Sequence, residues 1–303
     1  ARRRRRKVRA GRGATIAVAS GKGGTGKTTV AAHLALASSL SRKTLLVDLD
    51  VEAPDSRGYF HEAEPVGEEE PVLVPIPRFE GEACTGCRRC AQVCRFGAIM
   101  AIGRTVTVND KLCKGCGRCV NLCPSTSLRE MMAEVGTVAR YRLESLDLLE
   151  GRMAVGDIRS TAVIEAAKRH AVRIETEVQI RDCPPGVSCP ATHAIEGADF
   201  VILVAEPTDF SRHDLEAALK LVRDRGLESG VVINKDGFGS ADIAGLCGSY
   251  GVPVIGRLAF TRERASSGAA ARLWRDDAEF MREMTAILEA AMPALALCEG
   301  GSR

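Results

Sequence analysis

Eight of the twelve cysteines fall in two runs with the same internal spacing, and these runs are the residues best suited to chemistry. Each run reads C-x2-C-x2-C-x3-C, and every cysteine of the second run follows its counterpart by 29 residues. The first run is Cys84, Cys87, Cys90 and Cys94, and the second is Cys113, Cys116, Cys119 and Cys123. A repeat at eight positions indicates an internal duplication. Thiolates at such spacing predict a metal centre.

This spacing resembles that of two-cluster bacterial ferredoxins, in which the fourth cysteine of each run binds the other run's cluster. The resemblance implies two [4Fe–4S] clusters. One would be held by Cys84, Cys87, Cys90 and Cys123, and the other by Cys113, Cys116, Cys119 and Cys94. Pro124 follows the second run as the motif expects, whereas Arg95 replaces the proline expected after the first run. This departure removes no ligand.

Two other interpretations of the cysteines are disfavoured. Disulfides form in oxidising compartments, but the N-terminal run of arginines lacks the apolar segment of a secretory signal. No stretch approaches the ~18 apolar residues of a membrane span. We therefore expect a cytoplasmic protein with reduced thiols. Zinc sites usually carry separated cysteine pairs, whereas three cysteines at tight spacing favour an iron–sulfur cubane.

A second motif, Gly21-x4-Gly26-Lys27-Thr28, lies between an apolar run at 14–19 and an Ala/Leu-rich segment at 30–40. A P-loop requires this context of strand, loop and helix. Its backbone N–H groups would bind phosphate, Lys27 would reach the β- and γ-phosphates, and Thr28 would bind Mg²⁺. The nucleotide-binding residues expected from the loop are Gly21, Gly23, Gly24, Thr25, Gly26, Lys27, Thr28 and Thr29.

Lys22 directly follows the first glycine, and Gly-Lys-Gly-Gly-Thr-Gly-Lys-Thr resembles the deviant P-loop of the MinD/ParA/Mrp ATPases and the nitrogenase iron protein. In that family the early lysine crosses a dimer interface to the partner's nucleotide, where it acts like an arginine finger. The resemblance implies an ATP-dependent homodimer, or a heterodimer with a similar ATPase, in which Lys22 and Lys27 are catalytic. It covers roughly residues 14–291.

The resemblance also extends to carboxylates that end two apolar runs. The segment 44–50 ends in Asp48 and Asp50 and resembles switch I, where an aspartate orients the attacking water. We assign that catalytic role to Asp50, with Asp48 supporting Mg²⁺. The run ending at Asp182 resembles Walker B, which implies that Asp182 holds the water shell of the metal.

Asn234 follows a later apolar run, and the family's asparagine at this position reads adenine. Guanine-specific relatives carry Asn-Lys-x-Asp, but Gly237 occupies the final position of that pattern here. The resemblance therefore favours ATP over GTP.

Apolar runs and helical segments alternate outside the cysteine region. We expect strands at 14–19, 44–50, 177–182, 200–205 and 230–233, and helices at 30–40, 212–225, 241–250 and 277–291. This alternation predicts an α/β fold with a doubly wound, mostly parallel sheet of the P-loop NTPase type and a ligand at the strand C-termini.

The cysteine region would interrupt this fold as an inserted small α+β domain of bacterial-ferredoxin type at 79–129, with short strands at 98–102 and 105–108. The ATPase domain would then comprise 14–78 and 130–303. Residues 62–70, which are acidic and flanked by proline, are expected to be a flexible lead into the insert. So small an insert has a marginal apolar core, so the clusters would supply folding free energy.

The net charge of +3 belongs to the N-terminus, because the first twelve residues hold eight Lys or Arg and no acid. We expect residues 1–13 to be a disordered basic tail without a specific nucleic-acid partner. Basic residues around the cysteines are read as charge compensation for anionic clusters in preference to a docking face for an acidic redox partner.

Four cysteines lie outside the runs. Cys183 and Cys189 lie in or just beyond the segment that resembles switch II, and buried structural thiols are favoured there over a site shared across a dimer or a redox switch. Cys247 and Cys298 are isolated, and the five histidines form no metal-ligand pattern.

Two classes of function follow from these motifs. In the first, ATP binding and hydrolysis rearrange a dimer and gate electron transfer through the clusters to an unidentified redox partner. In the second, a nucleotide-switched assembly, carrier or positioning protein uses the clusters as structure, sensor or cargo. Membrane positioning is disfavoured because the segment 277–297 is rich in acids where a basic amphipathic helix is needed. The duplicated ligand set favours electron transfer.

Overall fold

The structure is a computed structural model that describes residues 13–269 and 271–292. The chain forms two compact units, and the first comprises the described parts of 1–69, 138–152 and 164–303. The second comprises 70–137 and 153–163, which is wider than the insert of 79–129 expected from the sequence. The difference arises because strands with no clear apolar alternation lead into and out of the cysteine region.

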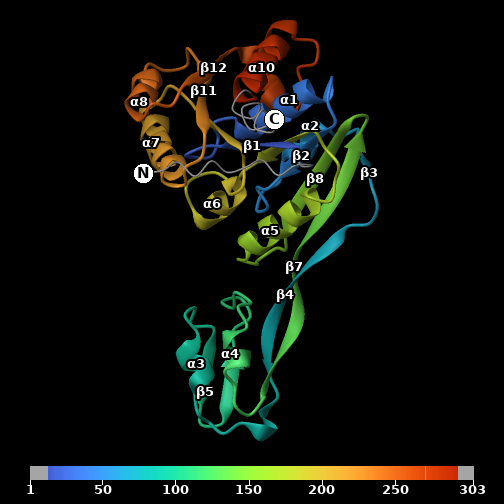
Figure 1. The fold of residues 1–303 in the computed structure, drawn as a ribbon, viewed down its shortest axis with the longest axis vertical. Helices are drawn as coiled ribbons and strands as arrows, with labels where there is room; N and C mark the ends of the chain where they lie inside the picture. Colours follow the sequence, from blue (N-terminus) through green and yellow to red (C-terminus); the bar gives the residue numbers. More distant parts are fainter. Residues whose placement is uncertain (1–12, 270, 293–303) are drawn as a thin grey trace, which may run out of the picture. The chain divides into compact units, whose positions relative to one another are not determined.

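A mostly parallel sheet forms the centre of the first unit (Figure 1). Its strand order is β12-β11-β10-β1-β9-β2-β8-β7-β3. The strands are β1 (Ala14–Ala19), β2 (Thr44–Asp48), β3 (Glu64–Pro65), β7 (Leu128–Leu143), β8 (Leu146–Met153), β9 (Val178–Asp182), β10 (Phe200–Ala205), β11 (Ser229–Asp236) and β12 (Val254–Ala259). From β12 to β8 every pairing is parallel, whereas β3 pairs with β7 in the antiparallel direction. The expected α/β fold with a mostly parallel sheet is confirmed.

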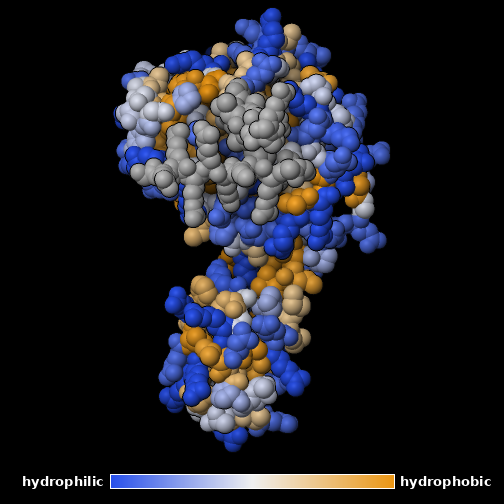
Figure 2. All heavy atoms as spheres, viewed as in Figure 1, coloured by the Kyte–Doolittle hydropathy of each residue, from blue (hydrophilic) through white to orange (hydrophobic). Residues whose placement is uncertain are grey.

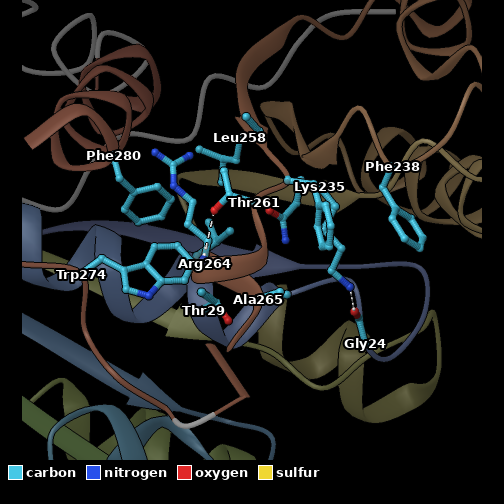
Figure 3. Close-up of a pocket in the computed structure, with 15 residues that line it drawn as sticks. Gly24, Thr29, Lys235, Phe238, Leu258, Thr261, Arg264, Ala265, Trp274 and Phe280 are labelled. Carbon is cyan, nitrogen blue, oxygen red and sulfur yellow. Dashed lines mark hydrogen bonds between the residues drawn. The ribbon is translucent and has the colours of Figure 1, made fainter. Parts of the chain in front are cut away.

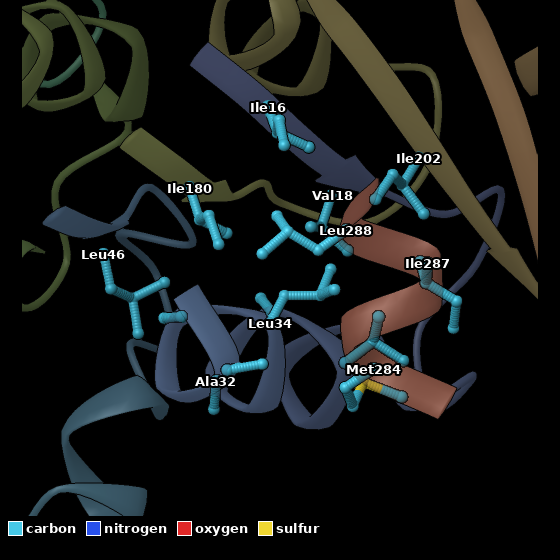
Figure 4. Packing of buried hydrophobic residues seen from close by; sticks show 14 of the residues in the cluster. Ile16, Val18, Ala32, Leu34, Leu46, Ile180, Ile202, Met284, Ile287 and Leu288 are labelled. Carbon is cyan, nitrogen blue, oxygen red and sulfur yellow. The ribbon is translucent and has the colours of Figure 1, made fainter. Parts of the chain in front are cut away.

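Helices cover both faces of this sheet because its central strands are apolar on both sides. The helices are α1 (Lys27–Ser39), α2 (Ser56–Tyr59), α5 (Ser160–Ala171), α6 (Cys189–Ile195), α7 (Asp209–Asp224), α8 (Ile243–Tyr250), α9 (Arg262–Ala269) and α10 (Ala278–Ala291). On one face, Ile16 and Val18 of β1 pack with Leu34 of α1 and Leu288 of α10 (Figure 4). The other face is covered by α6 against β1 and α7 against β10.

The sequence of α10 explains its position. Phe280, Met284, Ile287 and Leu288 recur at helical spacing and are all buried, whereas the charged residues lie between them. This apolar face packs against α1 and β12 in the protein core. No helix within 13–269 and 271–292 combines the length and apolar character needed to cross a membrane.

The second unit contains the eight cysteines of the two runs. Its elements are β4 (Glu70–Phe79), the 3-10 turn η1 (Gly81–Ala83), α3 (Arg89–Val93), β5 (Ile99–Ile102), β6 (Thr105–Val108) and α4 (Arg118–Asn121). The antiparallel pair β5–β6 agrees with the two short strands expected from the sequence. One small core cluster of this unit combines three cysteines with three apolar residues, namely Cys84, Cys90, Cys119, Ile99, Val106 and Leu128.

One segment before the cysteine unit differs from the expectation. Residues 62–70 were expected to be a flexible lead, but Glu64 and Pro65 pair with β7 and Glu70 begins β4. Backbone pairing with β7 holds this segment, and such pairing depends on residues far along the chain. Parts of three expectations lie outside the described residues, namely residues 1–12 of the tail, residues 293–297 of the C-terminal segment, and Cys298.

Candidate functional site

The glycine-rich loop joins the C-terminal end of β1 to the start of α1, which begins at Lys27. Gly24 and Gly26 adopt left-handed backbone angles, with φ of 80° and 85°. A Cβ on Gly26 would lie 2.2 Å from Nδ2 of Asn234, which itself donates a hydrogen bond of 2.7 Å to the Thr25 carbonyl. Glycine is therefore required at Gly26 both for the turn and for the approach of Asn234.

Carboxylates from neighbouring strands meet the loop at the same edge of the sheet. Asp48 and Asp182 end β2 and β9, are directly paired in register and are fully buried. Lys27 Nζ lies 2.5 Å from Asp182 Oδ1 and 3.8 Å from Asp50 Oδ2. Burial acts to lower the pKa of Lys27, but the charge and hydrogen bond of Asp182 outweigh it, so the pKa is raised and the lysine stays cationic.

Asp48, Asp50 and Asp182 lie close together at this edge of the sheet, so their negative charges repel one another. Burial and the charge of Asp182 raise the pKa of Asp48 to about 8, although the Ser56 N–H donates to Asp48 Oδ2 at 2.9 Å. Burial raises the pKa of Asp50 to about 6, against the lowering effect of Lys27. Like-charge repulsion of this kind is relieved by a divalent cation, so the donor set of carboxylates with the nearby Thr28 hydroxyl fits Mg²⁺.

Asp48 and Asp50 differ in what their oxygens can do. Both oxygens of Asp48 accept backbone N–H bonds, from Asp50 at 3.0 Å and from Ser56 at 2.9 Å. The Asp50 side chain is 19% exposed and reaches the edge of the site. Asp48 therefore fixes the backbone of 50–56, whereas Asp50 remains accessible to water.

The Lys22 side chain forms an ion pair within its own subunit. Its Nζ is 3.3 Å from Oε2 of Glu206, which follows β10, and Oε1 of Glu206 pairs with Lys235. The sequence analysis did not single out Glu206 or Lys235. A carboxylate directly after the apolar run 200–205 was the available signal, because the same pattern identified Asp48 and Asp182.

A largely apolar pocket of about 310 Å³ adjoins the loop (Figure 3). Gly24, Gly26 and Asn234 line its polar side, and the aromatic rings of Phe238, Phe260, Trp274 and Phe280 line the remainder. Arg264 also lines it, but its charge is paired with Asp277 and Glu283 at 3.1 and 3.3 Å. A planar, uncharged group beside the phosphate loop fits this lining, as a nucleotide base would.

His33 connects the loop helix to this pocket. Its Nδ1–H donates to the Thr29 carbonyl at 2.7 Å, and its Nε2 accepts the Trp274 backbone N–H at 3.0 Å. Burial lowers the pKa of His33 to about 4, so the ring is neutral. The histidine thus holds Trp274 in the pocket wall.

The cysteines of the second unit line two cavities, each with members of both runs. Cys84, Cys87, Cys90 and Cys123 line the first, and Cys94, Cys113, Cys116 and Cys119 line the second. All are free thiols in the structure. The structure therefore brings together the same two sets of four that the ferredoxin-type pattern grouped.

Hydrogen-bond donors point to several of these sulfurs. The Ala98 N–H donates to Cys94 Sγ at 3.3 Å, and the Gly115 N–H donates to Cys113 Sγ at 3.4 Å. A backbone hydrogen bond from Arg89 lowers the pKa of Cys87. Among the described residues, no group of three or more His, Cys, Asp or Glu side chains is arranged as the ligands of a metal ion.

The two remaining described cysteines of interest are dissimilar. Cys183 is fully buried directly after Asp182, and burial raises the pKa of its thiol to about 12. A thiol with such a pKa is a poor nucleophile at neutral pH. Cys189 is exposed at the start of α6.

A glycine loop of this geometry between a central parallel strand and a helix N-terminus is a phosphate site, and it defines the P-loop class of nucleotide-binding α/β proteins. Within that class, the chain belongs to the CobQ/CobB/MinD/ParA nucleotide-binding domain family, whose family model matches residues 16–271. It is thus a nucleotide-binding protein of the MinD/ParA ATPase type.

Relatives and solved structures agree with this assignment. Uncharacterized protein MJ0578 of Methanocaldococcus jannaschii is 32% identical over 73% of this chain and 78% of its own length. The septum site-determining protein MinD from Pyrococcus horikoshii, complexed with Mg-ADP, matches with a TM-score of 0.57 and 18% identity over 95% of this chain and 99% of its own. A putative plasmid partition protein from Borrelia burgdorferi bound to AMPPNP matches with a TM-score of 0.52 and 15% identity over 92% and 98%. At these identities the structural matches concern the fold alone.

Proposed function

We propose that this protein is a dimerising ATPase that holds two [4Fe–4S] clusters and couples nucleotide-driven rearrangement to electron transfer through them. The observation that carries the proposal is the division of the eight cysteines between two cavities, each lined by three cysteines of one run and one of the other. This exchange of the fourth ligand is the arrangement that two-cluster ferredoxins use.

The cysteine geometry suits a cluster better than a single ion. Zinc binds four ligands at about 2.0–2.3 Å from one centre, which requires the sulfurs to converge. In a cubane each cysteine binds a different iron, so the four sulfurs stand farther apart around a shared cavity. Each set of four cysteines lines one shared cavity, as the ligands of a cubane would.

The small core of the second unit also favours bound clusters. Three of its six fully packed members are cysteines, and large apolar side chains stay outside. Phe96, Met100 and Ile102 are 46%, 59% and 69% exposed, and Figure 2 shows such hydrophobic residues among hydrophilic ones at the surface of this unit. Metal ligation would supply the folding free energy that this core lacks. When bound, the clusters would supply one-electron redox chemistry.

For the nucleotide, we propose ATP with Mg²⁺. Asn234 lies against the phosphate loop beside the apolar pocket, and Gly237 lacks the carboxylate that a guanine base would require. Lys27 would bind the phosphates, and Thr28 with Asp182 would hold Mg²⁺ and its water shell. Asp50 would orient the attacking water, because it is accessible while both Asp48 oxygens are occupied by backbone N–H groups.

ATP hydrolysis and electron transfer would be coupled through the segments of the chain that connect the two units. The cysteine unit begins soon after the segment that contains Asp50, and the chain returns from it before β9, which ends at Asp182. A rearrangement of these two segments on hydrolysis would therefore act on the chain segments that connect the two units. If ATP changes the affinity for electrons, reduction must change the affinity for ATP by the same factor.

A second candidate is a positioning or assembly ATPase in which the clusters have a structural or sensory role. The fold shared with a septum site-determining MinD and a plasmid partition protein favours this alternative. ATP affinity measured for oxidised and dithionite-reduced protein distinguishes the two. A difference of ~5–150-fold is expected for typical coupling, and equal affinities would favour the second candidate.

The metal content is tested on protein purified without oxygen. We expect about eight iron and eight sulfide per chain, as two cubanes require. Cys123→Ser should disturb the cluster bound by the first run, whereas Cys247→Ser, which alters a buried cysteine outside both runs, should retain all the iron. Zinc in place of iron, or equal iron loss in both variants, would contradict the proposal.

A further inference from the structure

We propose that Glu206 is the counter-ion that holds Lys22 within its own subunit and competes with the partner subunit's phosphates for this lysine. The inference rests on the proposed function in one respect, because only dimerisation around ATP gives Lys22 a second destination. The consequence is a barrier to dimerisation that is built into each subunit.

Glu206 lies between two lysines that come from different loops. Its Oε2 is 3.3 Å from Nζ of Lys22 in the glycine loop, and its Oε1 is 2.5 Å from Nζ of Lys235 after β11. The side chain of Glu206 is only 9% exposed. A carboxylate with so little access to water must keep at least one cation beside it.

The backbone fixes the position of this carboxylate. The N–H of Glu206 donates to Ser211 Oγ at 2.9 Å, and its carbonyl accepts the Thr208 N–H at 2.8 Å. Pro207 follows and restricts Glu206 to an extended conformation. The main chain of Glu206 is therefore fixed, and the ion pair with Lys235 holds the carboxylate if Lys22 leaves.

The two lysines are held to different degrees. Lys235 adopts a left-handed backbone conformation, with φ of 54°. Its Nζ also donates to the Gly24 carbonyl at 3.0 Å, as Figure 3 shows. Lys22 Nζ has only the Glu206 contact among the described residues, and its side chain is 30% exposed.

This difference makes an exchange possible. Lys235 can remain as the cation that Glu206 requires, while Lys22 is released to a phosphate group. Because the Lys22 contact is partly exposed, its contribution is limited to that of a weak ion pair, up to about 1 kcal/mol. Removing the Glu206 charge should then favour dimerisation by up to about fivefold for each of the two subunits, which is about 25-fold for the symmetric dimer.

The first test measures the reactivity of Lys22 without nucleotide. Reductive methylation followed by peptide mass spectrometry gives the labelling rate of this lysine in the wild type, Glu206→Gln and Glu216→Gln. The matched control removes a carboxylate that pairs with Lys220 on α7, at 2.8 Å. Lys22 should react severalfold faster in E206Q and at the wild-type rate in E216Q. Equal rates in all three proteins would overturn the proposal.

If E206Q does not fold, Lys235→Met provides the same test with the opposite sign. Glu206 would then have Lys22 as its remaining cation, so labelling of Lys22 should be slower than in the wild type. Unchanged or faster labelling of Lys22 in folded K235M would overturn the proposal.

The second test measures dimerisation by sedimentation with a non-hydrolysable ATP analogue. E206Q should dimerise at up to about 25-fold lower concentration, and this gain should disappear in a Lys22→Ala background. An unchanged or weaker dimer in E206Q would overturn the competition. If the labelling rates differ as expected but no protein dimerises, the Glu206 contact stands and ATP-driven dimerisation is refuted.

Discussion

The buried histidine beside the nucleotide pocket predicts how stability depends on pH. His33 has a pKa of about 4 in the folded protein, compared with 6.5 for an ordinary histidine. Between these values the unfolded chain binds a proton that the folded chain does not, so the free energy of unfolding falls as the pH falls. The contribution is fully present above pH 6.5 and is lost progressively toward pH 4.

The magnitude follows from the two pKa values. Lowering the pH from 7.5 to 5 should cost about 2 kcal/mol from this histidine alone, and the loss should approach about 3 kcal/mol at pH 4. The structural cause is burial of the ring, and the hydrogen bond to the Thr29 carbonyl acts in the opposite direction. The second proton would have to bind Nε2, which accepts the Trp274 backbone N–H.

The only tryptophan of the chain provides the assay. Trp274 stacks on His33 with ring centroids 4.7 Å apart, so its fluorescence reports unfolding at this place. Urea unfolding at pH 7.5 and pH 5 should give a smaller pH-dependent loss in His33→Gln than in the wild type, by about 2 kcal/mol. His61→Gln, which alters an exposed histidine, is the control. An equal pH-dependent loss in all three proteins would refute the reasoning.

The remaining predictions concern the phosphate site. Asp50→Ala should bind ATP but hydrolyse it ~10²-fold or more slowly in a phosphate-release assay, and hydrolysis at the wild-type rate would transfer the role to Asp48. Lys27→Ala should lose nucleotide binding measured by calorimetry, because we propose that the cation that faces Asp50 and Asp182 binds the phosphates; unchanged affinity would contradict this role. Gly26→Ala should lower the melting temperature and weaken nucleotide binding, since its Cβ would lie 2.2 Å from Asn234; wild-type values for both would contradict the requirement for glycine.

The sequence alone predicts the parts of the site that are local. Residues 14–28 contain the strand, the loop and the helix start in one stretch, and the carboxylates Asp48 and Asp182 directly follow apolar runs. The five strands and four helices that were expected outside the cysteine region follow the same rule, because each has its own apolar run or period. The bounds of these elements agree with the expectation to within a few residues.

The parts that depend on distant segments are not predicted. The aromatic wall of the pocket combines Phe238, Phe260 and Trp274, which come from three separate loops. The 16-residue strand β7 mixes charged and apolar residues without clean alternation, so its pairing is determined by its partners. Glu206 was missed for a related reason, because its two lysines are distant in sequence and meet it only in the folded chain.

The position of β9 has a consequence for synthesis of the chain. In the sheet, β9 lies between β1 and β2, although it follows both by well over a hundred residues in the sequence. A nascent chain therefore holds two central strands without the strand that joins them until residues 178–182 have left the ribosome. During this interval the whole stretch that contains both cysteine runs is already synthesised. Because long-range pairing is slow and exposed strand edges promote misassembly, the nucleotide site can close only after the cysteine unit has had time to fold.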